Sequence, residues 1–288
     1  MRSENGNFQA VRWYRGRSTI LPVQGEHVMA YDINNRGEIV AMSMIDSGAY
    51  PPVTRGYLID ARGRVTDLGV GPTPFVNVPI MLNDAGQVAG TNSLGIGFRW
   101  DRGRLLEIAP SGSFSVVTDM NERGQVVGYL NRDGHTRAFI WSNGTTTELG
   151  TLGGSSSEAT AINDLGQVVG TSSTANPSDR DAFIWSAGRM TALGLPGESG
   201  RASRINNLGQ VIATDRDPSA ASLELAYRSY LWQHGRLVPL AGLDGGEAQA
   251  YDLNEFGVVV GASLTADPAH PGRPPASRPA RWRTLGRS

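Results

Sequence analysis

An Asn–x–x–Gly turn between two short apolar runs occurs six times in this chain, and no other feature constrains the fold as strongly. The turns begin at Asn34, Asn83, Asn121, Asn163, Asn206 and Asn254, so successive copies lie 49, 38, 42, 43 and 48 residues apart. Asparagine tolerates left-handed backbone and caps its own turn, while the glycine supplies positive φ at no steric cost. Only Gly or Ala stands seven residues after each Asn, as expected where neighbouring repeats approach closely. A hairpin repeated at this period indicates one supersecondary unit repeated in space.

A second hairpin, centred on an aromatic strand and a turn glycine, lies between successive Asn turns. Its strands are rich in aromatic and β-branched residues and alternate at period two, and no stretch has a sustained 3.6-residue period. The two hairpins make a four-stranded unit. We therefore predict an all-β, six-bladed β-propeller of four-stranded antiparallel blades. The blades are expected to start near residues 27, 76, 114, 157, 200 and 247, within a single domain of residues 1–288.

Each end of the chain carries a further tryptophan strand. Residues 8–23, around Trp13, precede the first Asn turn, and Pro279–Gly286, around Trp282, follow the last one. Joining such a strand to the sixth unit would close the ring and remove the exposed sheet edges. We expect the N- and C-terminal strands to meet in the last blade. The sequence leaves open whether Trp13 or Trp282 takes its third strand.

Composition excludes several kinds of chemistry. All 26 basic residues are arginine, which excludes lysine catalysis, and the absence of cysteine excludes disulfides, thiolate catalysis and cysteine-bound zinc. A net charge of −1 offers no concentrated basic face for nucleic acid. No apolar run approaches a membrane span, and the N-terminus as given lacks the apolar core of a signal peptide. We expect a cytoplasmic protein without nucleic-acid or membrane partners, or an extracellular one if the gene start is truncated. The oligomeric state stays open.

Residues Leu149–Ser173, LGTLGGSSSEATAINDLGQVVGTSS, followed by DAFIW at Asp181–Trp185, resemble the bacterial HAF repeat. That pattern runs Leu-Gly-Thr-Leu-Gly-Gly, then Ala-Ile-Asn-Asp-x-Gly-Gln-Val-Val-Gly, then His-Ala-Phe-x-Trp. The resemblance covers about residues 8 to 286 and is strongest in the third to fifth units. It implies a propeller-like repeat protein, of a family often assigned to the outside of the cell and without a general biochemical activity. The histidine of the family's triplet is Arg137 or Asp181 here.

The position two residues before each turn Asn varies far more than the rest of the repeat. It is occupied in turn by Asp32, Met81, Asp119, Ala161, Arg204 and Asp252. Ring closure would make the first and sixth blades neighbours and bring Tyr31–Asp32 beside Tyr251–Asp252, with Arg204 on the other flank. Two adjacent carboxylates raise one another's proton affinity, while an adjacent arginine keeps its partner ionised. We interpret the position as the wall of an axial polar pocket. The structural alternative is that Asp32 and Asp252 accept backbone N–H bonds or seal the channel through Arg204.

Polar residues at the approaches to the innermost strands extend the predicted site. The ligand-binding candidates are Asp119, Arg204, Met81, Arg201, Glu247, Gln249 and Glu158. His27 is the best placed of the four histidines to act as a base. No histidine spacing fits zinc, so we expect no cofactor, with calcium on axial carboxylates as the alternative.

We therefore predict a small-molecule-binding propeller with an axial polar pocket at the seam of the sixth and first blades. The first alternative is a cofactor-independent enzyme (a cyclase, isomerase, lyase or hydrolase) in which Asp32, Asp252, Tyr31, Tyr251 and His27 transfer protons. The second is a protein-interaction platform built on the long loops of the first, fifth and sixth units. An enzyme requires a carboxylate of raised pKa in a partly dry pocket, and a platform would show apolar loop tips.

Overall fold

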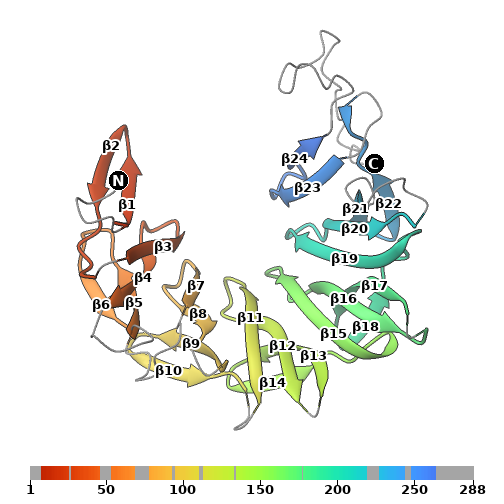
Figure 1. Cartoon of the computed structure of the whole chain (residues 1–288), viewed down its shortest axis with the longest axis horizontal. Coiled ribbons are helices and arrows are strands. Elements are labelled where there is room, and N and C mark those ends of the chain that lie inside the picture. Colours follow the sequence, from red (N-terminus) through yellow and green to blue (C-terminus); the bar gives the residue numbers. More distant parts are fainter. Residues whose placement is uncertain are drawn as a thin grey trace.

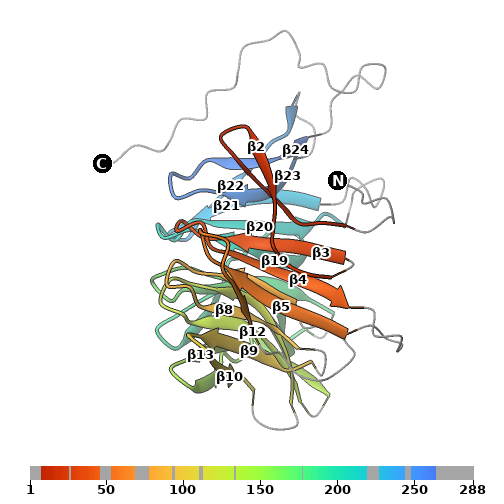
Figure 2. The same ribbon diagram turned by 90° about the vertical axis from the view of Figure 1, so that its left-hand side faces the viewer.

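The computed structural model describes residues 8–25, 27–45, 53–68, 78–92, 95–109, 113–132, 134–176, 178–218, 227–243 and 248–263. Within these ranges every named element is a β-strand and there is no α-helix, which confirms the all-β prediction. Five four-stranded antiparallel sheets follow one another along an arc, and a two-stranded sheet stands at either end (Figure 1). Seen from the side, strands of different blades lie nearly parallel across the thickness of the arc (Figure 2). The arrangement is propeller-like.

Each complete blade contains strands A to D, in chain order from the concave side of the arc outward (Figure 1). The A strands are β3 (His27–Ile33), β7 (Val78–Leu82), β11 (Phe114–Met120), β15 (Gly153–Ile162), β19 (Glu198–Ile205) and β23 (Ala248–Leu253). The B strands are β4 (Ile39–Ile45), β8 (Val88–Thr91), β12 (Val126–Arg132), β16 (Val168–Thr174), β20 (Val211–Arg216) and β24 (Val259–Ser263). The C strands are β5 (Val53–Ile59), β9 (Gly97–Asp101), β13 (His135–Ser142), β17 (Arg180–Ser186) and β21 (Tyr227–Gln233). The D strands are β6 (Val65–Asp67), β10 (Arg104–Glu107), β14 (Thr145–Glu148), β18 (Arg189–Ala192) and β22 (Arg236–Pro239). β1 (Val11–Tyr14) and β2 (Arg17–Ile20) form a hairpin before blade 1.

The hydrophobic core lies between blades, because each sheet is covered on both faces by its neighbours. In strand C of blade 3, Ala138 and Ile140 join a buried cluster with Phe183 of blade 4. The alternate residues Phe139 and Trp141 point to the opposite face and pack in a cluster shared with blade 2. Period-two alternation in the C strands thus fills both boundaries of a blade with apolar side chains.

A β-bulge interrupts strand A of every blade at the same place. In blade 3, Val117 pairs with Gly128 and Asp119 pairs with Val127, which leaves Thr118 as the extra residue. The equivalent extra residues are Tyr31, Ile80, Thr160, Ser203 and Tyr251. A bulge bends the strand and redirects the side chains that follow it. In each blade the residue that follows the bulge is the variable position before the turn Asn.

The bulge explains the small residue seven positions after each Asn. A Cβ added at Gly128 would lie 1.9 Å from the backbone oxygen of Val116, and one at Gly170 would lie 2.0 Å from that of Glu158. Both oxygens belong to strand A of the same blade. The close approach is therefore within a blade, and not between neighbouring repeats as the sequence suggested.

The arc is open in the described part of the chain. The β1–β2 hairpin lies beyond blade 1 at one end and β23–β24 lies at the other, and no strand pairing among the described residues joins them (Figure 1). Six closed blades in a single domain therefore remain a prediction. The Trp282 strand, Glu247 and parts of the three long loops lie outside the described residues.

Candidate functional site

The turn asparagines form a continuous row of hydrogen bonds through the blades. In blade 2, Asn83 Oδ1 accepts the backbone N–H groups of Ala85 and Gln87 at 3.1 and 3.0 Å. Its Nδ2 donates to Gln87 Oε1 at 2.8 Å and, across the blade boundary, to the backbone oxygen of Asn121 at 3.2 Å. The same inter-blade bond recurs from Asn34, Asn121, Asn163 and Asn206 to the next turn asparagine, at 2.9–3.0 Å. The row ties together the turns between strands A and B of successive blades. These turns lie on one face of the arc, which we call the turn end.

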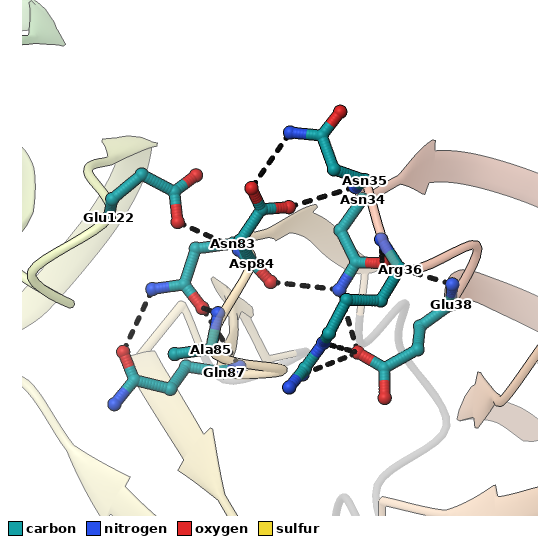
Figure 3. A network of polar contacts seen from close by, with 9 residues as sticks. All are labelled: Asn34, Asn35, Arg36, Glu38, Asn83, Asp84, Ala85, Gln87 and Glu122. Atoms are coloured by element: carbon teal, nitrogen blue, oxygen red, sulfur yellow. Dashed lines mark hydrogen bonds and ion pairs between the residues drawn. The ribbon is translucent and has the colours of Figure 1, made fainter.

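A second row follows one residue later, and sequence reasoning missed it. The backbone N–H of Asp84 donates to Glu122 Oε2 at 2.8 Å (Figure 3). That of Glu122 donates to Asp164 Oδ1 at 2.9 Å. The row runs through Asn35, Asp84, Glu122, Asp164, Asn207 and Glu255. All six are Asn, Asp or Glu, so each offers an acceptor. That uniformity was readable in the sequence, where the more variable position two before the Asn drew attention instead.

Asp32 and Asp119 each tie their own blade to the next one. Asp32 accepts the N–H of Ile33 through Oδ1 at 2.8 Å and that of Leu82, in blade 2, through Oδ2 at 2.9 Å. Asp119 does the same for Met120 and for Ile162 of blade 4, both at 2.9 Å. The receiving blades carry Met81 and Ala161 at this position, which offer no side-chain acceptor; Met81 packs beside an apolar cluster. These bonds favour the structural interpretation of both aspartates.

Asp119 has the most perturbed carboxyl group of the inner wall. Burial raises the pKa of Asp119 to about 6, against the backbone N–H bonds from Ile162 and Met120, which lower it. Arg204 lowers and Asp32 raises the same pKa through space, so the three charged groups share one electrostatic environment around the axis. Burial also raises the pKa of Glu122, against the hydrogen bond from the Asp84 N–H, which lowers it, while the charges of Asp84, Asp164 and Asp32 add to the rise. The turn end of the axis is therefore a carboxylate-rich region.

The structure brings Arg204 and Asp252 together, as the sequence suggested. Arg204 Nε lies 3.3 Å from Asp252 Oδ1, which also accepts the N–H of Leu253 at 3.0 Å. Both side chains are more than half exposed, so the ion pair is weak. Asp32 and Asp252 are not in contact among the described residues, because β3 and β23 lie on opposite sides of the opening (Figure 1).

Tyr31 and Tyr251 occupy bulge positions on those same two strands. Both side chains are exposed. Partial burial nevertheless raises the pKa of Tyr31. Tyr251 Oη lies 3.4 Å from Gln249 Oε1, close enough for a hydrogen bond along its own strand.

The remaining candidates lie nearer the start of strand A. His27, the first residue of β3, packs its ring 5.7 Å from that of Phe8. Glu158 Oε1 lies 3.5 Å from Arg180 Nη2. Burial raises the pKa of Tyr129, the charge of Glu158 adds to this rise, and the charge of Arg201 opposes it. Arg201 and Gln249 are exposed. These candidates lie three to five residues before the variable position on their A strands, and a mouth shared with the aspartates stays a prediction.

A pocket of about 160 Å³ lies at the turn end, between blades 3, 4, 5 and 6. It is lined by Met120, Asn121, Glu122, Ile162, Asn163, Asp164, Ile205, Asn207 and Glu255. The asparagines and carboxylates on its wall are held by the two inter-blade rows, so the wall is preorganised. Beside it, the turn tips of blades 4 to 6 expose Leu165, Leu208 and Phe256. The site can offer hydrogen-bond acceptors to a small polar ligand and an apolar rim to a larger one.

Two features are absent from the described ranges. They contain no helix long and apolar enough to cross a membrane. Nor do they contain three histidine, aspartate or glutamate residues grouped to hold a metal ion.

The fold is shared with solved enzymes of low sequence identity. A dipeptidyl peptidase 4 from Porphyromonas gingivalis matches 86% of this chain at 10% identity and a TM-score of 0.53, over 46% of its own length. An acylaminoacyl peptidase from Pyrococcus horikoshii matches 86% at 11% identity and 0.50, over 44% of its length. An oligogalacturonate lyase in complex with manganese matches 87% at 11% identity and 0.51, over 76% of its length. This chain thus spans less than half of either peptidase, and the likeness shows the fold alone. No family model and no curated protein matches the sequence.

Proposed function

We propose that this chain is a small-molecule-binding β-propeller, of HAF-repeat type, whose ligand occupies the axial pocket at the turn end. The complete ring has six blades, and the sixth is the one that β23 and β24 begin. The ligand is a small polar molecule that carries hydrogen-bond donors. We further propose that it needs no cofactor and that the protein acts in the cytoplasm.

The observation that carries this proposal is the preorganised acceptor wall. Glu122 uses Oε2 to accept the N–H of Asp84, and Glu255 uses Oε2 to accept that of Asn207. Both residues also line the pocket, and we propose that the second carboxylate oxygen of each meets the ligand there. A wall already fixed by bonds to the next blade loses little side-chain entropy when a ligand binds. A row of hydrogen bonds that served only to hold the blades together would need no pocket beside it.

Native mass spectrometry of the purified protein tests the proposal. The wild type should carry a small-molecule adduct, and Glu122→Gln/Glu255→Gln should lose it. Glutamine keeps the side-chain oxygen that accepts the N–H of the neighbouring blade, but it removes both negative charges. Glu148→Gln, on the outer strand β14, makes the same kind of change away from the pocket and should keep the adduct. Added manganese and calcium salts test for a metal in the same experiment. A wild type without any adduct, or a double variant that retains it, refutes the pocket.

The hydrogen bonds of Asp119 serve the structure, and its pKa carries the enzymatic alternative, since a carboxyl group with a pKa of about 6 can act as a general acid or base near neutral pH. A lyase among the proteins of similar fold is compatible with this reading. Asp32, Asp252, Tyr31, Tyr251 and His27 stay secondary proton-transfer candidates. A first assay uses oligogalacturonate with and without manganese. Turnover that disappears in Asp119→Asn would support an enzyme, and no turnover leaves binding as the better proposal.

The interaction-platform alternative draws on the apolar turn tips. Leu165, Leu208 and Phe256 are 65, 55 and 80% exposed on three successive blades. Contiguous exposed apolar side chains mark many protein-binding surfaces. A variant with all three changed to serine should lose a protein partner in a pull-down from the source cell, while it retains any small-molecule adduct.

A further inference from the structure

The β1–β2 hairpin is the outer half of a blade. The N–H of Leu21 donates to the backbone oxygen of Ala10 at 2.9 Å, just after β2 ends. Each complete blade has the same bond between its C and D strands: Leu68 to Gly56, Ile108 to Gly97, Leu149 to Ala138, Leu193 to Ala182 and Leu240 to Ser229, at 2.8–3.0 Å. The turn also matches, because Arg15–Gly16 and Arg102–Gly103 both have positive φ. Ala10 is therefore equivalent to Ala138, and Trp13 to Trp141.

The hairpin also sits against blade 1 as such an outer half should. Ala10 and Leu21 are buried in one cluster with Val28 and Ile39 of blade 1. Their equivalents Ala138 and Leu149 pack against blade 4 in the same way. The opposite face is bare: Trp13 is 75% exposed, whereas Trp141 is 1% exposed against blade 2. The hairpin thus lacks the preceding blade that its tryptophan should contact.

The other end of the arc has the complementary gap. Among the described residues, β23–β24 is an inner half without C and D strands, and Val260 on β24 is 59% exposed. On blade 5, a pocket of about 330 Å³ is lined by Leu231, Gln233, His234, Arg236 and Val238; we name these residues the tryptophan socket.

A complete boundary shows what such a socket holds. Leu231 precedes Trp232 in strand C of blade 5, just as Arg99 precedes Trp100 in blade 2. The guanidinium of Arg99 stacks 4.9 Å from the ring of Trp141, which comes from the next blade. The socket is therefore where the tryptophan of a completed sixth blade would lie.

We infer that Trp13 of the chain's own hairpin occupies the tryptophan socket and that β1 pairs with β24 to complete blade 6. In blade 3, Val126 pairs with Trp141, Val127 with Ile140 and Gly128 with Phe139. The equivalent register places Val259 opposite Trp13, Val260 opposite Arg12 and Gly261 opposite Val11.

The hairpin's own contacts select it over the Trp282 strand and over a second copy. It is already held on blade 1 in the required place, because Ala10 and Leu21 are buried with Val28 and Ile39. A tether within one chain also gives a far higher effective concentration than a second copy does. The inference takes only the six-bladed ring from the proposed function and makes no use of a ligand.

Engineered disulfides test the register cleanly, because the native chain has no cysteine. Directly opposed residues of an antiparallel pair lie within the 4.4–6.8 Å Cα separation that a disulfide needs, whereas diagonal pairs do not. Arg12→Cys/Val260→Cys should therefore oxidise nearly completely to a crosslinked monomer, read by intact mass and non-reducing electrophoresis. Arg12→Cys/Ala262→Cys, displaced by two residues on the same face, is the matched control and should stay mostly reduced.

Other outcomes overturn the inference. Crosslinking of Arg281→Cys/Val260→Cys would assign the strand to the Trp282 segment. A 12–260 disulfide found only in dimers would assign the socket to a second copy, and no 12–260 disulfide would reject the pairing. As a second measurement, Trp13→Ala and Leu231→Ala should each lower the melting temperature with non-additive effects, while Trp282→Ala should not. A crosslinked monomer without any small-molecule adduct would keep this inference and reject the proposed function.

Discussion

Asn121 shows how one buried side chain holds two blades in register. It accepts the N–H groups of Arg123 and Gln125, and it donates to Gln125 and to the backbone oxygen of Asn163. Alanine would leave these buried backbone groups without a partner, and each such group costs about 1–3 kcal/mol. An apolar core residue can often be replaced by another apolar residue of similar size. Asn121 has no such substitute, because its oxygen caps the turn while its amide group donates to the next blade.

Asn121→Ala should therefore lower the free energy of unfolding by about 2–4 kcal/mol, since several buried bonds are lost at once. The control is Asp60→Ala in the outer turn of blade 1. Asp60 caps its own turn by accepting the N–H groups of Arg62 and Arg64, both within the same blade. Its loss should be clearly smaller, because no bond to another blade is removed. Urea unfolding of both variants measures the difference, and equal losses would show that the inter-blade bond contributes nothing.

Asp119 should give the fold a characteristic dependence on pH. Its pKa is raised from 3.8 to about 6, mainly by burial, so the folded state keeps a proton that the unfolded state has released between these values. Its stabilising contribution is complete below pH 3.8 and is lost as the pH rises through 6, by at most about 3 kcal/mol. Asp119→Asn removes this titration. Unfolding free energies from pH 4 to 7 should therefore shift in favour of the variant, and a constant difference would refute the assignment.

At the scale of the element, the β-bulge of strand A decides which side chains face the axis. It advances the strand by one residue, so the residue two positions before the turn Asn directs its side chain toward the next blade. There Asp32 accepts the N–H of Leu82, and Asp119 accepts that of Ile162. The bulged backbone also needs space. Glycine at positions 128, 170 and 261 provides it, because a Cβ there would meet a backbone oxygen at 1.9–2.0 Å.

Gly170→Ala tests this reading of the bulge. The added Cβ would meet the Glu158 oxygen at 2.0 Å and the Phe183 ring at 2.9 Å, so strand A must shift, at a cost of about 1–3 kcal/mol. The reverse change, Ala213→Gly at the equivalent position of blade 5, leaves space and should cost about 1 kcal/mol or less. Thermal unfolding of the pair distinguishes them. A Gly170→Ala variant as stable as the wild type would mean that the bulge relaxes freely.

At the scale of the whole molecule, the repeat alone predicted the all-β blades and the contact between Arg204 and Asp252. Both follow from local signals, namely the Asn turns, the period-two strands and the order of the copies along the chain. The bonds between blades were harder to foresee. They depend on how far each turn is offset against the next one, and periodicity within one blade carries no information on that offset. Asp32 therefore looked like half of a seam pair, whereas its oxygens accept N–H groups from its own blade and from blade 2.

The closure of the ring depends on the two ends of the chain, and a permuted chain tests it directly. If the β1–β2 hairpin is the outer half of blade 6, moving residues 8–23 to follow Ser263 through a short linker makes every blade continuous in sequence. The new N-terminus is then Gln24, between the hairpin and blade 1. Blade 1 keeps its cover, because Ala10, Leu21 and Val23 can still pack against Val28 and Ile39.

We expect this permutant to unfold in one cooperative transition and to melt at least as high as the parent that ends at the same residue, since closure no longer spans the whole chain. The same chain without residues 8–23 should melt several degrees lower, because the apolar cluster of blade 1 is uncovered. Differential scanning calorimetry compares the three chains, and a permutant no more stable than the deletion would mean that the hairpin gains nothing from β24.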